Sequence, residues 1–353
     1  MNILIFGAGA IGTYIGGSLL LHGHTVTFLE RPEGAARLRE RGLALDLSLA
    51  GQGVHEISAT KFGIATNLAE ALEHSQYDLA LFALKSFDTP AAAEAMRPFA
   101  AAMPPLLCLS NGVENETELA AVLGKEKVIP GTVTSAVSRT APGAAKLEKL
   151  RGIGIDRNHP IAATCFQAFE QAGLRPRLYE EAGSMKWSKL LTNLVANASS
   201  AILDMSPAEI FAHPGLYRLE MEQLKEALAV MRAQNLPVVD LPGTPTRWLA
   251  RLTSLPAFLR PLARPILAKG RGEKMPSLHI DLHAGRSQSE VSYLNGAVVR
   301  FGERYGIPTP TNRILNDLLL SLVRGELPRE AFARQPQKLL AMWHEALAEA
   351  KRK

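Results

Sequence analysis

Three polar residues recur at every fourth position in the stretch from Trp187 to Asn197. Lys189, Asn193 and Asn197 stand there among leucine, valine and alanine residues. On an α-helix this spacing forms a polar line along an otherwise apolar cylinder. A buried ammonium group and buried carboxamides cost several kcal/mol unless each finds a polar partner, and a small ligand with several polar groups is a natural partner. The alternative is the solvated face of a surface helix.

A glycine-rich turn lies near the start of the chain. Asn2–Phe6 is a short apolar run typical of a buried parallel strand, and a helix pattern reaches Leu21 after the turn. The turn consists of Gly7, Ala8, Gly9, Ala10, Ile11 and Gly12. Glycines in this pattern make a tight turn, let backbone N–H groups approach a pyrophosphate and let the helix pack close to the strand. Because a second strand pattern follows at Thr25–Leu29, we predict that the turn binds a dinucleotide.

Two adjacent charged residues at the end of the second strand bear on the choice of cofactor. An acidic residue there binds the ribose hydroxyls of NAD, whereas an arginine accommodates the 2′-phosphate of NADP. Glu30 and Arg31 supply both. We expect Arg31 to hold the 2′-phosphate and Glu30 to turn its carboxylate outward, so the sequence predicts a preference for NADPH. The alternative for either residue is a charged side chain that merely caps the strand.

Two further polar residues follow predicted strands. Lys85 ends the apolar run Tyr77–Leu84, and Asn111 with Gly112 follows the run Leu106–Ser110. The carboxyl ends of parallel strands meet the ligand crevice of such a fold, so both residues are candidates for cofactor binding. The alternatives are a solvated loop lysine and a simple Asn-Gly turn.

The predicted secondary structure that positions these groups changes along the chain. At 353 residues the chain exceeds the ~250–300 at which single cores stop growing, so two domains are expected. Strand and helix patterns alternate as far as Tyr179, and long helix patterns take over from Glu181. We therefore predict an α/β fold in which a Rossmann-type dinucleotide-binding domain, residues 1–180, precedes an all-helical domain, residues 181–353.

Three segments within these domains have specific predictions. The sequence between the strand patterns Gly131–Thr134 and Gly152–Ile155 is turn-rich, so we expect a connection there. In the second domain the patterns predict single helices over Pro207–Gln234 and over Glu290–Tyr305.

The composition argues against several classes of protein. Cys108 and Cys165 are the only cysteines and lie in apolar runs, which indicates buried thiols and neither a disulfide framework nor a zinc site. The chain starts with a strand pattern, and no uncharged apolar run approaches ~18 residues, so we expect a cytoplasmic protein without a membrane segment.

Residues 241–275 carry a net charge of +6 against +5 for the whole chain. We expect a solvated face or an anion-attracting rim there and no nucleic-acid site.

A histidine pair follows shortly after this basic stretch. His279 and His283 have i, i+4 spacing, with Asp281 between them, and such a pair could bind a metal ion. The neighbouring sequence suggests no third ligand, so we predict no metal site.

Three stretches together resemble the ketopantoate reductase family, the 2-dehydropantoate 2-reductases. They are Gly7–Gly12 with Arg31, then Trp187-x-Lys189-Leu-x-x-Asn193-x-x-x-Asn197, and then Glu290–Gly296 followed by Gly306–Pro310. The likeness extends from the first residue to near residue 325. It implies a Rossmann domain, a helical domain and an active site in the cleft between them. It also implies NADPH-dependent reduction of a 2-oxo acid, ketopantoate first among the substrates.

The resemblance implies two catalytic residues. Lys189 would donate the proton, and Glu290 would lie near the nicotinamide ribose and the reacting hydroxyl. Glu290 has an alternative reading, because Ser287-x-x-Glu290 fits a capping box.

The resemblance also implies the substrate-binding residues. Asn193 and Asn197 would hydrogen-bond the substrate, and Asn111 would lie between the substrate and the nicotinamide. Ser277 would contact the carboxylate of the substrate.

The chain departs from the family pattern on the substrate side. Where the family has Ser-Ser-Met-Leu-Gln-Asp, this chain has Met-Pro-Ser-Leu-His-Ile-Asp over residues 275–281, and both the segment before Glu290 and the basic insert are longer. Two alternatives therefore stand beside ketopantoate reduction: a reductase of another branched 2-oxo acid, and a dinucleotide-sensing module without catalysis. The sequence leaves a homodimer open.

Overall fold

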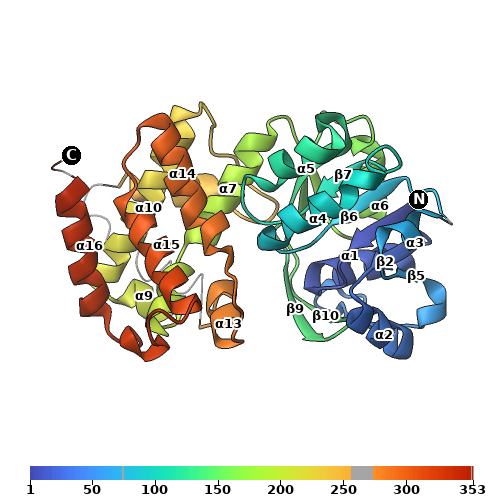
Figure 1. Cartoon of the computed structure of the whole chain (residues 1–353), viewed down its shortest axis with the longest axis horizontal. Coiled ribbons are helices and arrows are strands. Elements are labelled where there is room, and N and C mark those ends of the chain that lie inside the picture. The colour runs from blue at the N-terminus through green and yellow to red at the C-terminus, as the bar shows by residue number, and fades with distance from the viewer. Residues whose placement is uncertain (74, 256–272, 351, 353) are drawn as a thin grey trace. The chain divides into compact units, whose positions relative to one another are not determined.

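The protein is described by a computed structural model covering residues 1–73, 75–255, 273–350 and 352. It divides into two compact units, and Figure 1 labels many of their elements. One unit comprises Met1–Ser110, Glu114–Lys186 and Leu241–Thr244, and the other comprises Asn111–Val113, Trp187–Asp240 and Pro245–Lys353. The first is α/β with a Rossmann-type parallel sheet and the second is helical, so the predicted fold class is confirmed.

An eight-stranded sheet forms the centre of the first unit. Its strands are β1 (Asn2–Phe6), β2 (Thr25–Leu29), β5 (Gly63–Ala65), β6 (Leu79–Phe82), β7 (Leu106–Cys108), β8 (Val128–Val133), β11 (Ile153–Asp156) and β12 (Pro176–Tyr179). Their order is β12-β11-β8-β7-β6-β1-β2-β5, and only the β8–β11 pairing is antiparallel. The chain moves outward from β1 in both directions, which is the doubly wound arrangement that leaves a ligand crevice at the carboxyl ends of the strands.

Helices cover both faces of this sheet. Alternate residues of β1 point to opposite faces, so Ile3 and Ile5 join one apolar core while Leu4 and Phe6 join another. The first core contains side chains of α1 (Ala10–Leu21), α2 (Pro32–Arg41) and α6 (Ala162–Gln171). The second contains side chains of α3 (Leu68–Glu73), α4 (Thr89–Met96) and α5 (Asn115–Leu123). Burial on both faces explains why the strand sequences read as continuous apolar runs.

A second, four-stranded sheet packs against α1. It has the order β4-β3-β10-β9, from β3 (Leu43–Asp46), β4 (Val54–Ile57), β9 (Ala136–Ala141) and β10 (Ala144–Lys149). The expectation of a turn-rich connection before Gly152 is therefore wrong. β9 and β10 bury few side chains, so they lack the apolar run that marks a central strand; Ala145 and Leu147, alternate residues of β10, are the ones in the core.

The second unit is built from helices around one apolar core. They are α7 (Ala182–Leu194), α8 (Ala198–Leu203), α9 (Pro207–Ala212), α10 (Pro214–Ala233), α11 (Thr246–Thr253), α13 (Ser277–His283), α14 (Asn295–Tyr305), α15 (Pro310–Val323) and α16 (Pro336–Ala350). Of the basic stretch, residues 256–272 lie outside the described residues.

Both long helices predicted in this unit are interrupted. Pro214 lacks an N–H group and ends α9, and the ring of His213 accepts the first N–H groups of α10, from Gly215 and Leu216. The segment predicted as one helix from Glu290 begins as a short 3-10 helix, η6 (Glu290–Tyr293), and α14 starts only after Leu294. The break before α10 is capped by the side chain of His213, whereas no side chain caps the start of α14 at Leu294.

Candidate active site

The glycine turn of the first unit has the geometry that the sequence predicts. Gly7 has a φ of 89°, which favours glycine, and its N–H donates to the carbonyl of Leu29 at 3.0 Å. A Cβ on Gly12 would lie 1.9 Å from the carbonyl oxygen of Gly7, so the close approach of α1 to β1 requires glycine. A Cβ on Gly9 would meet nothing within 4 Å. The protein itself does not need glycine there, which fits a turn kept open for a pyrophosphate at the N-terminus of α1.

Glu30 faces this turn. Its carboxylate accepts the N–H of Ala8 at 2.7 Å and the N–H of Arg31 at 3.0 Å. The expectation that Glu30 turns its carboxylate outward is therefore wrong. Two backbone donors fix the carboxylate at the end of β2, where an acidic residue binds ribose hydroxyls.

Arg31 follows Glu30 in the chain and forms an ion pair with Asp88. Its side chain is 83% exposed, and its Nη2 atom lies 3.3 Å from Oδ1 of Asp88. Glu30, Arg31 and Asp88, together with Gly7, line a cavity of about 560 Å³ within the first unit. Its remaining wall is largely apolar, from alanine and leucine side chains and Phe99. An apolar wall with a few convergent polar groups suits an adenosine.

Lys85, a predicted cofactor-binding residue, lies at the same edge of the sheet as this cavity. Lys85 is half-buried and follows β6, the neighbour of β1, but it does not line this cavity.

The second unit brings together three asparagines of the sequence prediction. Nδ2 of Asn193 donates to Oδ1 of Asn111 at 3.0 Å, and Nδ2 of Asn197 donates to the carbonyl of Asn193 at 2.9 Å. Oδ1 of Asn197 accepts the N–H of Leu278 at 3.1 Å. Asn197 is thus satisfied by the protein through both ends of its carboxamide and is 6% exposed, whereas Asn111 and Asn193 are half-buried.

The predicted polar line is not carried by one helix. α7 ends at Leu194, Ala196 has a φ of 50°, and Asn197 precedes the first turn of α8. The hydrogen bond from Asn197 to the carbonyl of Asn193 nevertheless keeps the two residues adjacent. Lys189 is half-buried and lies on α7 one turn before Asn193.

Buried polar side chains that the sequence prediction missed hold this turn. The carboxylate of Glu220 accepts the N–H of Ala196, the hydroxyl of Ser199 and the side chain of Gln223, each at 2.6 Å. Glu220 is fully buried on α10. The signal was a charged residue on the apolar stripe of a predicted helix, because such a residue must have partners.

A second missed residue, Lys186, anchors the start of α7 in the first unit. Its Nζ atom lies 2.7 Å from the carboxylate of Glu116 and donates to the carbonyls of Ser110 and Gly131. It is 5% exposed, so its ammonium group is held by the fold.

The two remaining predicted residues differ in exposure. Glu290 is 2% exposed and makes a polar interaction inside the protein. The capping box with Ser287 is wrong, because the hydroxyl of Ser289 accepts the N–H of Val291 and caps η6. Ser277 is exposed at the first position of α13.

Comparison with protein families assigns the chain. The profile described as "Ketopantoate reductase PanE/ApbA" matches residues 3–157, and the one for its C-terminal domain matches residues 182–322. The chain belongs to the ketopantoate reductase family. It is therefore a dinucleotide-dependent oxidoreductase that acts on a 2-oxo acid.

Similarity to individual proteins supports this assignment to the ketopantoate reductase family. A 2-dehydropantoate 2-reductase of Halobacterium salinarum is 27% identical over 329 residues, which cover 90% of this chain and 98% of the relative. The crystal structure of a PanE/ApbA family ketopantoate reductase from Ralstonia eutropha superposes with a TM-score of 0.76 and 29% identity, covering 92% and 99% of the two chains. A D-mandelate dehydrogenase solved with NADH shares the fold, with a TM-score of 0.73 and 20% identity over 92% and 99% of the two chains.

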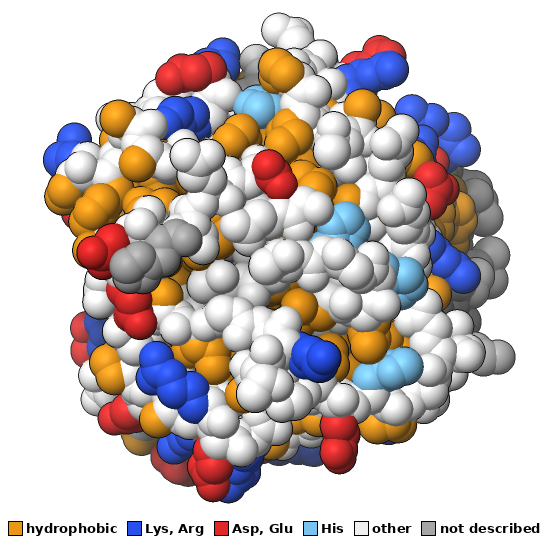
Figure 2. All heavy atoms as spheres, turned by 90° about the vertical axis from the view of Figure 1, so that its right-hand side faces the viewer, with side chains coloured by type: hydrophobic (Ala, Val, Ile, Leu, Met, Phe, Trp, Pro, Cys, Tyr) orange, Lys and Arg blue, Asp and Glu red, His pale blue; other side chains and the backbone are white. Residues whose placement is uncertain are grey.

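Two surface observations complete the description. On the face shown in Figure 2, acidic and basic side chains are interspersed and do not gather by sign. Among the described residues, no helix has both the length and the apolar character needed to cross a membrane.

Proposed function

We propose that this ketopantoate reductase family member converts ketopantoate to pantoate, a step of pantothenate and coenzyme A biosynthesis. The observation that carries the proposal is the bonded pair Asn111–Asn193 with Lys189 one helical turn away. A 2-oxo acid offers a keto oxygen and a carboxylate, both of which accept hydrogen bonds from ammonium and carboxamide groups. Relatives named 2-dehydropantoate 2-reductase support the choice of substrate.

In this proposal Lys189 donates the proton. A bound dinucleotide would supply the hydride to the keto carbon. The keto oxygen then becomes an alkoxide, and an ammonium group within hydrogen-bonding distance stabilises the charge and gives up a proton to form the 2-hydroxy acid. Glu290, a buried carboxylate, orients the substrate and the ammonium group.

Uncharged side chains bind the substrate alongside Lys189. Asn193 and Asn111, already bonded to each other, bind it without a large loss of side-chain entropy. Ser277 at the exposed start of α13 binds its carboxylate. Asn197 has both ends of its carboxamide engaged by the protein, so its contribution is to hold Asn193 and α13 in place.

For the cofactor we propose that NADH is preferred, against the expectation from Arg31. The carboxylate of Glu30 is fixed by two backbone donors at the ribose position, where it accepts hydroxyls and repels a phosphate dianion. NADPH is the second candidate, because Arg31 lines the same cavity and is exposed enough to reach a 2′-phosphate. An exposed ion pair such as Arg31–Asp88 contributes about 0–1 kcal/mol, so it would yield to a phosphate. Lys85 is proposed to approach the dinucleotide from the end of β6.

A second candidate substrate is another branched 2-oxo acid. It is favoured by α13, where the chain has His279 and Asp281, both buried, next to the position of Ser277. Their side chains pair with Asp204 and Arg286, so they change how α13 and Ser277 are held and leave Lys189 and Asn193 in place.

The test is oxidation of NADH and of NADPH with a panel of 2-oxo acids that includes ketopantoate, 2-oxoisovalerate and phenylglyoxylate. The proposal expects the highest kcat/KM for ketopantoate. A higher value for another acid would make the second candidate correct. Dinucleotide binding without turnover of any acid would favour a sensing module and refute catalysis.

A further inference from the structure

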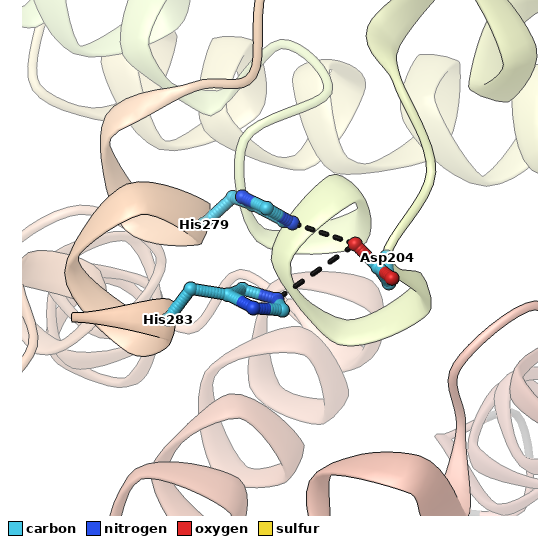
Figure 3. A group of neighbouring side chains, drawn as sticks. All are labelled: Asp204, His279 and His283. Carbon is cyan, nitrogen blue, oxygen red and sulfur yellow. Dashed lines mark hydrogen bonds and ion pairs between the residues drawn. The ribbon is translucent and has the colours of Figure 1, made fainter. Parts of the chain in front are cut away.

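Three side chains with metal-binding atoms meet within the second unit. His279 and His283 lie one turn apart on α13, and Asp204 follows α8 with a φ of 49°. In Figure 3 both imidazole rings point toward the same carboxylate oxygen. Nε2 of His279 lies 2.8 Å from Oδ1 of Asp204, and Nε2 of His283 lies 3.7 Å from that atom. The sequence suggests no third ligand for the histidines, and the fold supplies one from 75 residues earlier.

These distances suit a metal ion. The ligand atoms all lie within 4.8 Å of one another. Zinc binds imidazole nitrogen and carboxylate oxygen at about 2.0–2.2 Å, so the ligand atoms of a tetrahedral site lie about 3.4 Å apart. The two nitrogen–oxygen distances bracket that value. The rings are stacked at 4.0 Å between centroids, which keeps both nitrogens on the same side of α13.

The neighbouring groups shift the pKa values of Asp204 and His283. The hydrogen bond from His279 holds the pKa of Asp204 below its ordinary value. Partial burial, followed by the neighbouring His279, lowers the pKa of His283.

Two arginines beside the cluster oppose a cation. Arg334 is paired with Glu209, whereas Arg329 lies near His283. They reduce the affinity but do not block access, because the side chains of Asp204 and His283 are each 45% exposed.

We propose that His279, His283 and Asp204 bind one divalent transition-metal ion of the zinc class. Two imidazoles and one carboxylate suit zinc better than magnesium or calcium, which take oxygen ligands. The ion would join α13 to the connection after α8. Because the N–H of Leu278 is bonded to Asn197, it would also fix the start of α13 against the asparagine group.

The test is titration of the full chain, stripped with a chelator, with Zn²⁺ in a calorimeter and with Co²⁺ in an absorption spectrometer. The unmodified protein should bind one ion, and Co²⁺ should give the intense visible bands of a low-coordinate site. Asp204→Asn and His283→Ala should each weaken binding at least 100-fold, beyond the 10–100-fold that losing an outer partner costs. Asn tolerates the left-handed conformation of position 204, and His283 is partly exposed, so neither change threatens the fold.

His344→Ala provides the matched control, since His344 is an exposed histidine on α16. It should leave binding unchanged. The proposal is overturned if the unmodified protein binds zinc no more tightly than Asp204→Asn, or if His344→Ala weakens binding as much as His283→Ala.

Discussion

The side chain of Asn193 is hydrogen-bonded to the side chain of Asn111, 82 residues earlier in the sequence, at 3.0 Å. Each carboxamide thereby fixes the orientation of the other. Because Asn111–Val113 groups with the helical unit and not with the sheet that precedes it, the substrate-binding group proposed here is already assembled within one unit. Preformed polar groups bind a ligand with less loss of conformational entropy than mobile ones.

Lys189→Ala should lower kcat by about 10²–10⁴-fold, the contribution typical of a positioned general acid. The alkoxide forms only in the transition state, so the dissociation constant of the dinucleotide should stay unchanged. Steady-state kinetics and fluorescence titration measure the two effects. Lys225→Ala, on α10, is the matched control and should have little effect. A loss below about fivefold, far under this range, would mean that the proton comes from elsewhere.

Glu30→Ala should shift the preference from NADH toward NADPH by about tenfold or more. It removes the acceptor of the ribose hydroxyls and a negative charge beside the 2′-phosphate, and one tenfold step corresponds to about 1.4 kcal/mol. Arg31→Ala should weaken NADPH and leave NADH nearly unchanged, and Arg37→Ala, an exposed arginine of α2, should alter neither. Dissociation constants of NADH and NADPH for the unmodified protein and each variant test these expectations. If the unmodified protein binds NADPH more tightly than NADH, Glu30 does not control the choice.

Glu220→Ala should destabilise the protein by about 3 kcal/mol, because it leaves the N–H of Ala196 and the hydroxyl of Ser199 buried without their acceptor. Urea unfolding measures the change. Glu222→Ala, on the same helix but partly exposed, should cost less than about 1 kcal/mol. Equal effects of the two substitutions would show that Glu220 does not hold the turn. Glu220→Gln should lose less stability than Glu220→Ala. In this variant KM for the 2-oxo acid should rise more than kcat falls.

The capping box of α9 should make stability depend on acid pH. The hydrogen bond from the N–H of Ser206, opposed by partial burial and aided by Arg334, holds the pKa of Glu209 below its ordinary value. The stabilisation from this carboxylate is therefore present above the unfolded pKa of about 4.3 and is lost as pH falls through the lower folded value. The difference in stability between the unmodified protein and Glu209→Gln should shrink as pH falls below about 4.

Chemical unfolding at several pH values measures this dependence. Ser206→Ala is the comparison, because it removes the other half of the box at a cost of about 1 kcal/mol and should retain its effect where Glu209 is protonated. A difference for Glu209→Gln that does not change with pH would contradict the assignment.

Local patterns in the sequence determined the fold class and the dinucleotide turn. The run Asn2–Phe6 and the glycines at positions 7, 9 and 12 encode a strand, a turn and a helix through nearest-neighbour sterics, so no distant residue is needed to predict them. The family could be named from the sequence for the same reason, because its motifs are short and lie within single elements. β9 and β10 could not be predicted from the sequence, since they are polar strands that are stable only when paired with β3 and with each other.

The tertiary structure decided how the candidate side chains are arranged. The spacing of Lys189, Asn193 and Asn197 predicts one helix, yet the buried carboxylate of Glu220 stabilises a turn at Ala196 and places Asn197 at the start of the next helix. Asn111 meets Asn193, and Asp204 meets His279, only because the chain folds back over 82 and 75 residues. Contacts of this kind depend on packing between elements, and a periodic pattern within one element carries no information about them.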